Sequence, residues 1–288
     1  MPVPASNLIH GYSLEVSATA VPALVAVADR IASGTTIFIP YLPGEDDETR
    51  LVAAATVRDL GFEPMPHVPA RRIASLTALD SFIRRAVGEA GVESCFVIAG
   101  DAPAPKGPFA DSAALIDTGV FERAGITGIG VGGHPEGHPV MSEVERWAVL
   151  ARKCRSIDQR GMAPLIVTQF GFDADIVLAW LRALRERGIA HPVRVGVPGP
   201  AGIATLARYA ALCGVSASAS VWAKYGISLG KLLGTAGPDR FVDRLARGLT
   251  EAHGEVGLHL FPFGGIAQSV AWVERYRDGN CSSQRILQ

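Results

Sequence analysis

The chain has 288 residues, of which 48% are hydrophobic and 19% are charged, and its formal net charge is -1. This composition allows a large buried core and argues against disorder. A near-neutral chain without a basic run makes nucleic acid and anionic membranes poor candidates as partners. The first residues lack the basic start and apolar core of a signal peptide, and no apolar run reaches the roughly 20 residues that span a bilayer. We therefore expect a cytoplasmic protein.

Eight short β-branched runs recur along the chain, and most are followed by a stretch with helical periodicity. The predicted strands are Tyr12–Val16, Thr36–Pro40, Glu63–His67, Ser94–Ile98, Gly128–Val131, Leu165–Gln169, Val193–Val197 and Gly257–Phe261. The predicted helices are Asp47–Leu60, Asp80–Ala90, Ser142–Ile157, Asp175–Arg187 and Ala201–Leu212. Alternation over the whole length predicts a parallel sheet with right-handed crossovers. Eight units favour a closed (β/α)8 TIM barrel that forms one domain over residues 1–288.

One region departs from this alternation, because no clear strand occurs between Gly214 and Val256. After the run Ser216–Ser220, the pattern predicts helices that begin at Leu229 and at Asp239. We interpret the region as a helical insertion before the last strand, and a homo-oligomer is compatible with it. The four cysteines are scattered without C-x-x-C spacing, which predicts free thiols.

Polar residues cluster where the predicted strands end. In a barrel these ends converge on one mouth, so we expect residues from over half of the sequence to line one pocket. Glu15 lies in a short apolar strand, where a carboxyl group is costly to bury unless it is paired or functional. Burial favours its protonated form and would make it a proton donor; the alternative is a strand-end carboxylate bonded to a backbone amide. Asp101 follows Gly100 at the fourth strand and opens a proline-rich loop, which favours ligand binding over a local cap.

The segment after the fifth strand, Gly132–Pro139, places His134, Glu136 and His138 within five residues. Imidazole and carboxylate groups are metal ligands, but the prolines and glycine leave their directions open, so hydrogen bonding to a ligand is the favoured interpretation.

After the sixth strand, Gln169 offers both an amide donor and a carbonyl acceptor, which suits an amide-rich heterocycle. Phe170 and Phe172 offer rings for stacking or for the core, and Asp173 is interpreted as the cap of the next helix. His67 and Tyr41 also follow strand ends. Lys153 lies on the helix after the histidine segment, where it either is solvated or contacts a ligand phosphate.

In this order, these residues resemble the methylenetetrahydrofolate reductase family from about Ser13 to about Gly265. The resemblance rests on Glu15, Pro66-His67, Gly100-Asp101, His134–Pro139, Leu150–Lys153 and Thr168–Asp173. It implies a flavin-containing barrel of one-carbon metabolism and methionine biosynthesis. That barrel interconverts 5,10-methylenetetrahydrofolate and 5-methyltetrahydrofolate, with NADH or NADPH as the electron donor.

The resemblance also implies roles for single residues. Glu15 matches the general acid, and Asp101 matches a carboxylate that contacts the pterin and tunes the flavin. Gln169, with Phe170 beside it, matches the position that binds folate or nicotinamide. A further group matches the lining of the FAD site: Tyr41, His67, Gly100, His134, His138 and Lys153.

Three departures concern the flavin site. The first motif is Leu14–Thr19 instead of an aromatic run that ends in two prolines and an arginine. Ala99 stands where an arginine often precedes the Gly-Asp pair, and Pro40 stands where a threonine often precedes the tyrosine. Arg71 and Arg72 are candidates to compensate. The chain ends soon after the barrel, so we expect no regulatory domain.

Three alternatives stay open. One is a folate reductase without flavin, in which NADH passes hydride directly to the folate. Another is a metal-dependent barrel lyase or hydrolase centred on His134, Glu136 and His138. The third is a pterin- or flavin-binding barrel that has lost its chemistry.

Overall fold

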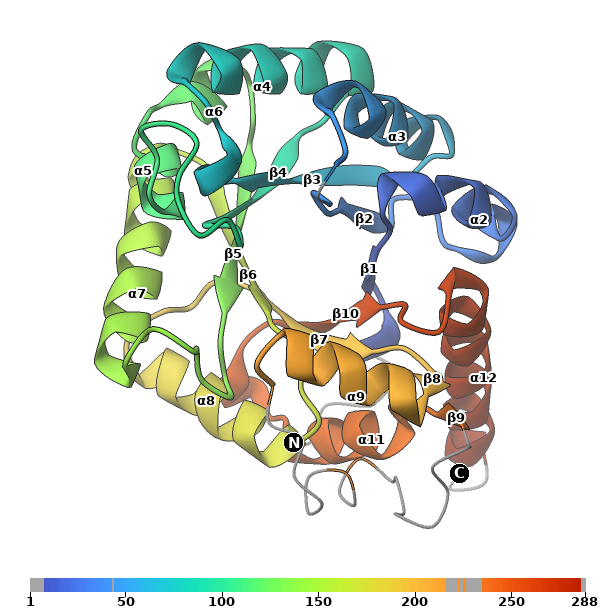
Figure 1. Cartoon of the computed structure of the whole chain (residues 1–288). Helices are drawn as coiled ribbons and strands as arrows, with labels where there is room; N and C mark the ends of the chain where they lie inside the picture. Colours follow the sequence, from blue (N-terminus) through green and yellow to red (C-terminus); the bar gives the residue numbers. More distant parts are fainter. Residues whose placement is uncertain (1–7, 43, 216–221, 223–224, 226–234, 286–288) are drawn as a thin grey trace. The chain divides into compact units, whose positions relative to one another are not determined.

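The computed structural model describes residues 8–42, 44–215, 222, 225 and 235–285 (Figure 1). Eight strands close into a parallel barrel in the order β1-β10-β7-β6-β5-β4-β3-β2. They are β1 Ser13–Glu15, β2 Thr36–Ile39, β3 Glu63–Pro69, β4 Ser94–Ile98, β5 Gly128–Gly133, β6 Ala163–Thr168, β7 Val193–Pro198 and β10 Val256–Phe261. The predicted (β/α)8 barrel is confirmed, and each predicted strand overlaps an observed one.

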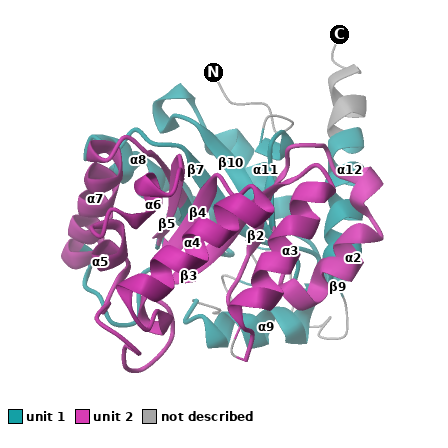
Figure 2. Ribbon diagram, turned by 90° about the horizontal axis from the view of Figure 1, so that it is seen from above, with its two compact units in different colours: residues 1–14, 134–143, 167–288 teal, residues 15–133, 144–166 magenta. Residues whose placement is uncertain are grey.

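The chain forms two compact units (Figure 2). Unit 1 comprises Met1–Leu14, His134–Glu143 and Val167–Gln288, and unit 2 comprises Glu15–Gly133 and Val144–Ile166. The single domain predicted over residues 1–288 stays a prediction.

Unit 2 carries the helices that precede or follow β2 to β5. They are α2 Val21–Val25, α3 Asp47–Asp59, α4 Leu76–Ala90, α5 Ser112–Ile116, α6 Val120–Arg123 and most of α7 Glu143–Gln159. Side-chain caps start the two long neighbours α3 and α4: Asp46 accepts from the Thr49 N–H at 2.8 Å, and Ser75 accepts from the Ala78 N–H at 3.1 Å. These helices lie side by side in both views (Figures 1 and 2). The short helices α5 and α6 were not predicted, because five and four residues are too few to show a period.

The buried face of α7 differs from the one that the helical period of Ser142–Ile157 predicts, which carries Val144, Trp147, Leu150 and Ala151. The helix buries Leu150, Lys153, Cys154 and Ile157. Val144, which the periodicity placed on the apolar face, is 78% exposed. Lys153 therefore belongs to the inner face of this helix rather than to a solvated one.

Unit 1 holds α8 Ala174–Glu186, α9 Ile203–Leu212, α11 Asp239–Gly248 and α12 Ile266–Arg285. The start predicted at Asp239 is confirmed, whereas Ser216–Ser220 and the helix predicted from Leu229 lie outside the described residues. The prediction that Gly214–Val256 contains no strand is wrong, because β9 Thr235–Ala236 pairs antiparallel with β8 Ala201–Gly202. A two-residue strand leaves no alternation in a sequence.

Free thiols are observed at Cys95, Cys154 and Cys213, as the spacing predicted. Within the described residues, no helix is long and apolar enough to cross a membrane.

Candidate active site

In unit 2, the carboxyl group of Glu15 at the end of β1 faces the imidazole of His67 in β3. The distance from Glu15 Oε2 to His67 Nε2 is 3.6 Å, and the two side chains are 22% and 9% exposed. Both residues were predicted to belong to the site, and the structure brings them together. A carboxyl group beside an imidazole can exchange a proton with it or with a bound ligand.

Aromatic rings on the two strands beside β3 pack against His67. The rings of Phe38 in β2 and Phe96 in β4 have centroids 6.0 and 4.8 Å from that of His67. A side chain at Gly130 in β5 would bring its Cβ to 2.7 Å from Phe96, so glycine leaves room for this layer. The environment of His67 is apolar, which strengthens any electrostatic interaction made there.

The Gly100-Asp101 pair lies after β4 in the same unit. Gly100 adopts a φ of +87°, and a Cβ on it would lie 3.0 Å from that of Pro69, so the position requires glycine. The exposed Asp101 accepts a hydrogen bond from Arg72 Nη2 at 2.8 Å. This guanidinium holds the pKa of the Asp101 carboxyl below its usual range. Asp101 is thus kept as an anion.

Arg71 and Arg72 both serve the loop that follows β4. The Arg71 side chain donates to the carbonyl oxygens of Ala102 and Ala110, at 3.2 and 3.0 Å, and its N–H donates to the carbonyl oxygen of Ala99. Arg71 therefore shapes the loop, whereas Arg72 reaches the Asp101 carboxylate. This division between the two arginines could not be read from the sequence.

Lys153 lies inside unit 2 and is only 7% exposed. Its Nζ donates to Ser112 Oγ in α5 at 3.3 Å, and burial lowers the pKa of the ammonium group. Its neighbour Arg152 instead forms an exposed ion pair with Asp117 at 2.8 Å. Only Lys153 of these two points inward.

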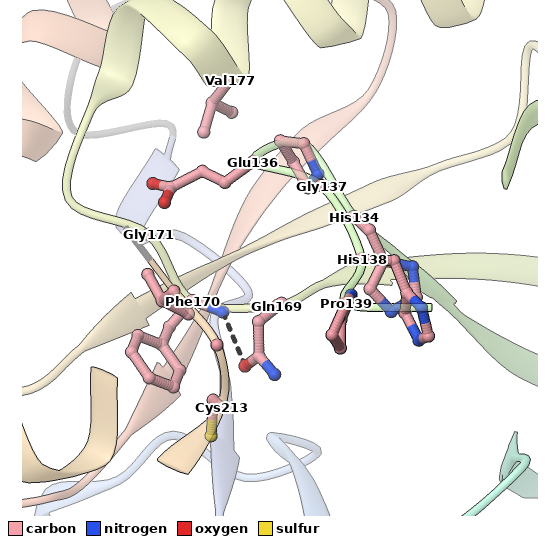
Figure 3. Close-up of a pocket in the computed structure, with 13 residues that line it drawn as sticks. His134, Glu136, Gly137, His138, Pro139, Gln169, Phe170, Gly171, Val177 and Cys213 are labelled. Carbon is pink, nitrogen blue, oxygen red and sulfur yellow. Dashed lines mark hydrogen bonds between the residues drawn. The ribbon is translucent and has the colours of Figure 1, made fainter. Parts of the chain in front are cut away.

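In unit 1, the histidine segment and the end of β6 line a cavity of about 150 Å³ (Figure 3). His134, His138, Gln169 and Phe170, all predicted site residues, are part of its lining. The Gln169 side-chain oxygen accepts the Phe170 N–H at 3.0 Å, drawn as a dashed line in Figure 3. The amide nitrogen of Gln169 is thereby set as the group that can donate to a ligand.

The rings of His134 and His138 meet edge to face, with centroids 4.8 Å apart. His138 Nδ1 accepts the Val140 N–H at 3.3 Å, which leaves Nε2 as the donor of a neutral ring. Glu136 points away from both rings toward Gly171 (Figure 3), and its Oε1 accepts the Phe172 N–H at 3.2 Å. Glu136 is therefore a loop-fixing residue here. Across the described ranges, no three His, Cys, Asp or Glu side chains are placed to share a metal ion.

The two phenylalanines after β6 are buried, with Phe170 2% and Phe172 1% exposed. Phe170 packs edge to face on Phe261 and Phe263, at centroid distances of 5.5 and 4.9 Å. Phe172 therefore belongs to the core, whereas Phe170 also reaches the cavity lining. Asp173 caps α8 as predicted, since it accepts the Asp175 N–H at 3.0 Å.

Two features of unit 1 were missed from the sequence. Cys213–Val215, just past α9, complete the cavity wall, but a helix end without polar side chains gives no signal. Ser13 in β1 hydrogen-bonds His259 in β10 through Oγ and Nδ1 at 2.9 Å, with both side chains buried. Alternation along β1 places Ser13 on the same face as Glu15, and this could have identified it.

In unit 2, Arg50 was also missed. This buried residue of α3 donates from Nη2 to the carbonyl oxygen of His67. Tyr41, predicted to bind the cofactor, lies under its guanidinium, 5.0 Å from Arg50 Cζ to the ring centroid. The convergence of both units' residues on one pocket stays a prediction.

Comparison with known proteins finds one family model, described as methylenetetrahydrofolate reductase, that matches residues 7–228. Among solved structures, dihydropteroate synthase from Thermus thermophilus is 14% identical with a TM-score of 0.48, covering 93% of this chain and 95% of its own. The carboxyl transferase domain of Rhizobium etli pyruvate carboxylase, determined with 3-bromopyruvate, is 12% identical with a TM-score of 0.44. That match covers 86% of this chain, which spans only 48% of the other.

Proposed function

Because the chain belongs to the methylenetetrahydrofolate reductase family, and so to the folate-related oxidoreductases, we propose that it interconverts 5,10-methylenetetrahydrofolate and 5-methyltetrahydrofolate. The electron donor is NADH or NADPH. The observation that carries the proposal is the Glu15 carboxyl group, 3.6 Å from a His67 imidazole that packs against two aromatic rings, at the position that the family resemblance assigns to the acid.

The reaction needs one proton at the folate amine that leaves when the five-membered ring opens to an iminium. Glu15 donates this proton, and His67 holds the carboxyl group in place and shares the proton with it. Asp101, kept ionised by Arg72, stabilises the positive charge that develops on the pterin. Gln169 binds the amide edge of the heterocycle through its side-chain nitrogen, and Phe170 supports it.

The donor set fits a flavin. His67 and Arg72 supply an imidazole and a guanidinium near the end of β3, and Gly100 follows the neighbouring strand β4, against Pro69. Tyr41, His134, His138 and Lys153 are the further residues that we propose to hold FAD. When bound, FAD would carry hydride between the nicotinamide and the folate.

The test has two parts. First, the purified protein is incubated with FAD, freed of excess, and its visible spectrum recorded before and after NADH and then methylenetetrahydrofolate. We expect a retained flavin band that NADH bleaches and the folate restores. If no flavin is retained but NADH and the folate still react, direct transfer replaces the flavin route. If neither occurs, the proposed function is wrong.

Second, Glu15→Gln removes the proton and nearly preserves the shape. We expect turnover to fall about 100-fold or more with little change in folate affinity, since general acids contribute about 10²–10⁴-fold. Glu63→Gln is the matched control, because Glu63 starts β3 and pairs with Arg58 at 2.6 Å, away from His67. Unchanged turnover in Glu15→Gln would remove Glu15 as the acid.

A further inference from the structure

Arg50 is a buried cation that the proposed chemistry does not use. Its residue is 2% exposed, and burial lowers the pKa of its guanidinium. Taking a charged group out of water costs free energy that only precise partners offset. The burial of Arg50 beside the site is therefore offset by the groups that its guanidinium contacts.

Its first partner is the backbone of β3. The ladder between β2 and β3 runs to the pair Ile39 and Pro66. β2 itself ends at Ile39. One residue along β3, the carbonyl oxygen of His67 accepts from Arg50 Nη2. A side chain of α3 thus supplies a donor to β3 beyond the end of β2.

Two rings and one carboxylate fix the guanidinium itself. Arg50 Cζ lies 5.0 Å from the centroid of Tyr41 and 4.8 Å from that of Phe82. Asp47, one turn earlier in α3, lies 3.5 Å from Nη1. These contacts offset the lost hydration of the charge through cation–π attraction and an ion pair.

Tyr41 carries a second guanidinium. Arg72 Cζ lies 5.2 Å from the same ring, and Arg72 pairs with Asp101 at 2.8 Å. The Tyr41 ring therefore links an arginine that holds His67 to an arginine that holds Asp101. All of these residues belong to unit 2.

We propose that Arg50 is a positioning residue of the active site. By fixing the His67 carbonyl it keeps the imidazole opposite Glu15, and through the Tyr41 ring it keeps Arg72 on Asp101. Tyr41 then acts through its ring on two arginines. The catalytic consequence rests on the proposed function, whereas the geometric consequence does not.

The test compares Arg50→Met and Arg50→Lys with the control Arg58→Met. Arg58 lies two turns later in α3 and also donates to a carbonyl oxygen, that of Gly91 at the end of α4, at 2.6 Å. It pairs with Glu63, at the start of β3. Arg58 thus belongs to the same helix and also anchors it to a backbone carbonyl oxygen, but that oxygen is not the one of His67. A general loss of helix anchoring would affect both sites alike.

The first readout needs no substrate or cofactor. The His67 imidazole is followed by nitrogen NMR with and without Glu15→Gln, which reports how strongly the two side chains interact. We expect Glu15→Gln to change the nitrogen chemical shifts of the His67 imidazole clearly in the parent and in Arg58→Met. In Arg50→Met we expect this change, the His67 response, to be at least twofold smaller. Arg50→Lys, which keeps the charge but loses the planar fork, should recover only part of it.

The second readout is turnover. We expect kcat to fall about 10- to 100-fold in Arg50→Met, with the KM for the nicotinamide changed by less than threefold, because small misplacements of catalytic groups cost about this much. An unchanged His67 response in both Arg50 variants would overturn the proposal. Should Arg50→Met fail to fold, the Arg50→Lys response decides in the same way. If the parent protein does not turn over folate but its His67 response depends on Arg50 as expected, the proposed function is refuted and the positioning role of Arg50 is not.

Discussion

Replacing Lys153 with methionine should make the protein more stable. Lys153 is 7% exposed, and the hydrogen bond of its ammonium group is to Ser112 Oγ at 3.3 Å. One neutral oxygen cannot replace the water that an ammonium ion loses on burial, which is why its pKa is lowered. Methionine has a similar length, no charge and a flexible thioether that fills the space.

The size of the effect follows from two opposing contributions. Substituting a buried charge by a well-packed apolar side chain stabilises by about 1–4 kcal/mol, and depriving Ser112 of its donor costs about 1 kcal/mol. We expect a net gain of up to about 3 kcal/mol. For a chain of this size that raises the Tm by up to about 6 °C, measured by scanning calorimetry. Lys106→Met, at an exposed lysine, is the control and should change the Tm little.

The gain should depend on pH with a definite sign. A lysine whose folded pKa is lowered destabilises the fold fully below that pKa, and the cost fades as pH rises toward the ordinary value of 10.5. The difference between Lys153→Met and the parent should therefore shrink in alkaline buffer. The same variant should bind FAD more weakly if Lys153 serves the cofactor. A Tm below that of Lys106→Met would refute the reasoning.

Two further predictions concern the loop after β4. Gly100→Ala should lose about 1–2 kcal/mol of stability for its left-handed backbone, plus the cost of the contact between its Cβ and Pro69. Gly125→Ala is the control, because Gly125 also has a positive φ, of +96°, but an added Cβ there would meet no atom within 4 Å. Gly100→Ala should therefore unfold at a lower urea concentration than Gly125→Ala, and equal midpoints would show that the contact costs nothing. Arg72→Met should raise the pKa of Asp101 toward its ordinary 3.8, seen by carboxyl-carbon NMR, because Arg72 is the main cause of the depression. A carboxyl group whose pKa is lowered by folding stabilises the fold above its unfolded pKa, and this stabilisation is lost as the pH falls, so the stability of the variant should vary less below about pH 4. An unchanged pKa of Asp101 in Arg72→Met would contradict this.

The barrel could be predicted because its strands are long enough to repeat the same pattern. β4 was predicted with its observed bounds, since a β-branched run ends there at a glycine and a carboxylate. The pair β8 and β9 escaped notice because two residues bonded to a distant partner carry no periodicity. On α7, the predicted apolar face failed at Val144, since the helix turns Lys153 inward in its place. A charged residue at a buried position misleads any argument based on hydrophobic period.

The candidate site divides along a similar line. Glu15, His67 and Asp101 could be found because each is a polar residue at the end of an apolar strand. Arg50 could not be found in that way, since it lies in a helix and its partner is a backbone carbonyl oxygen, which every residue has. Phe172 was offered as a stacking ring, but its neighbours Trp222 and Tyr225, at centroid distances of 4.7 and 5.0 Å, keep it in the core.

We propose that two arginines after the neighbouring strand compensate for the absence of an arginine at Ala99. The short 3-10 turn Ala70–Arg72 after β3 delivers two guanidiniums to the loop after β4, one to its carbonyl oxygens and one to Asp101. A charge needed at a strand end can come from either adjacent strand, because parallel neighbours end at the same edge. The guanidinium of Arg72 then reaches the loop after β4 from β3 instead of from β4. Its removal should change the pKa of Asp101 more than it changes the stability of the fold. Motif comparison along one strand would miss this exchange, whereas the geometry of two strands makes it visible.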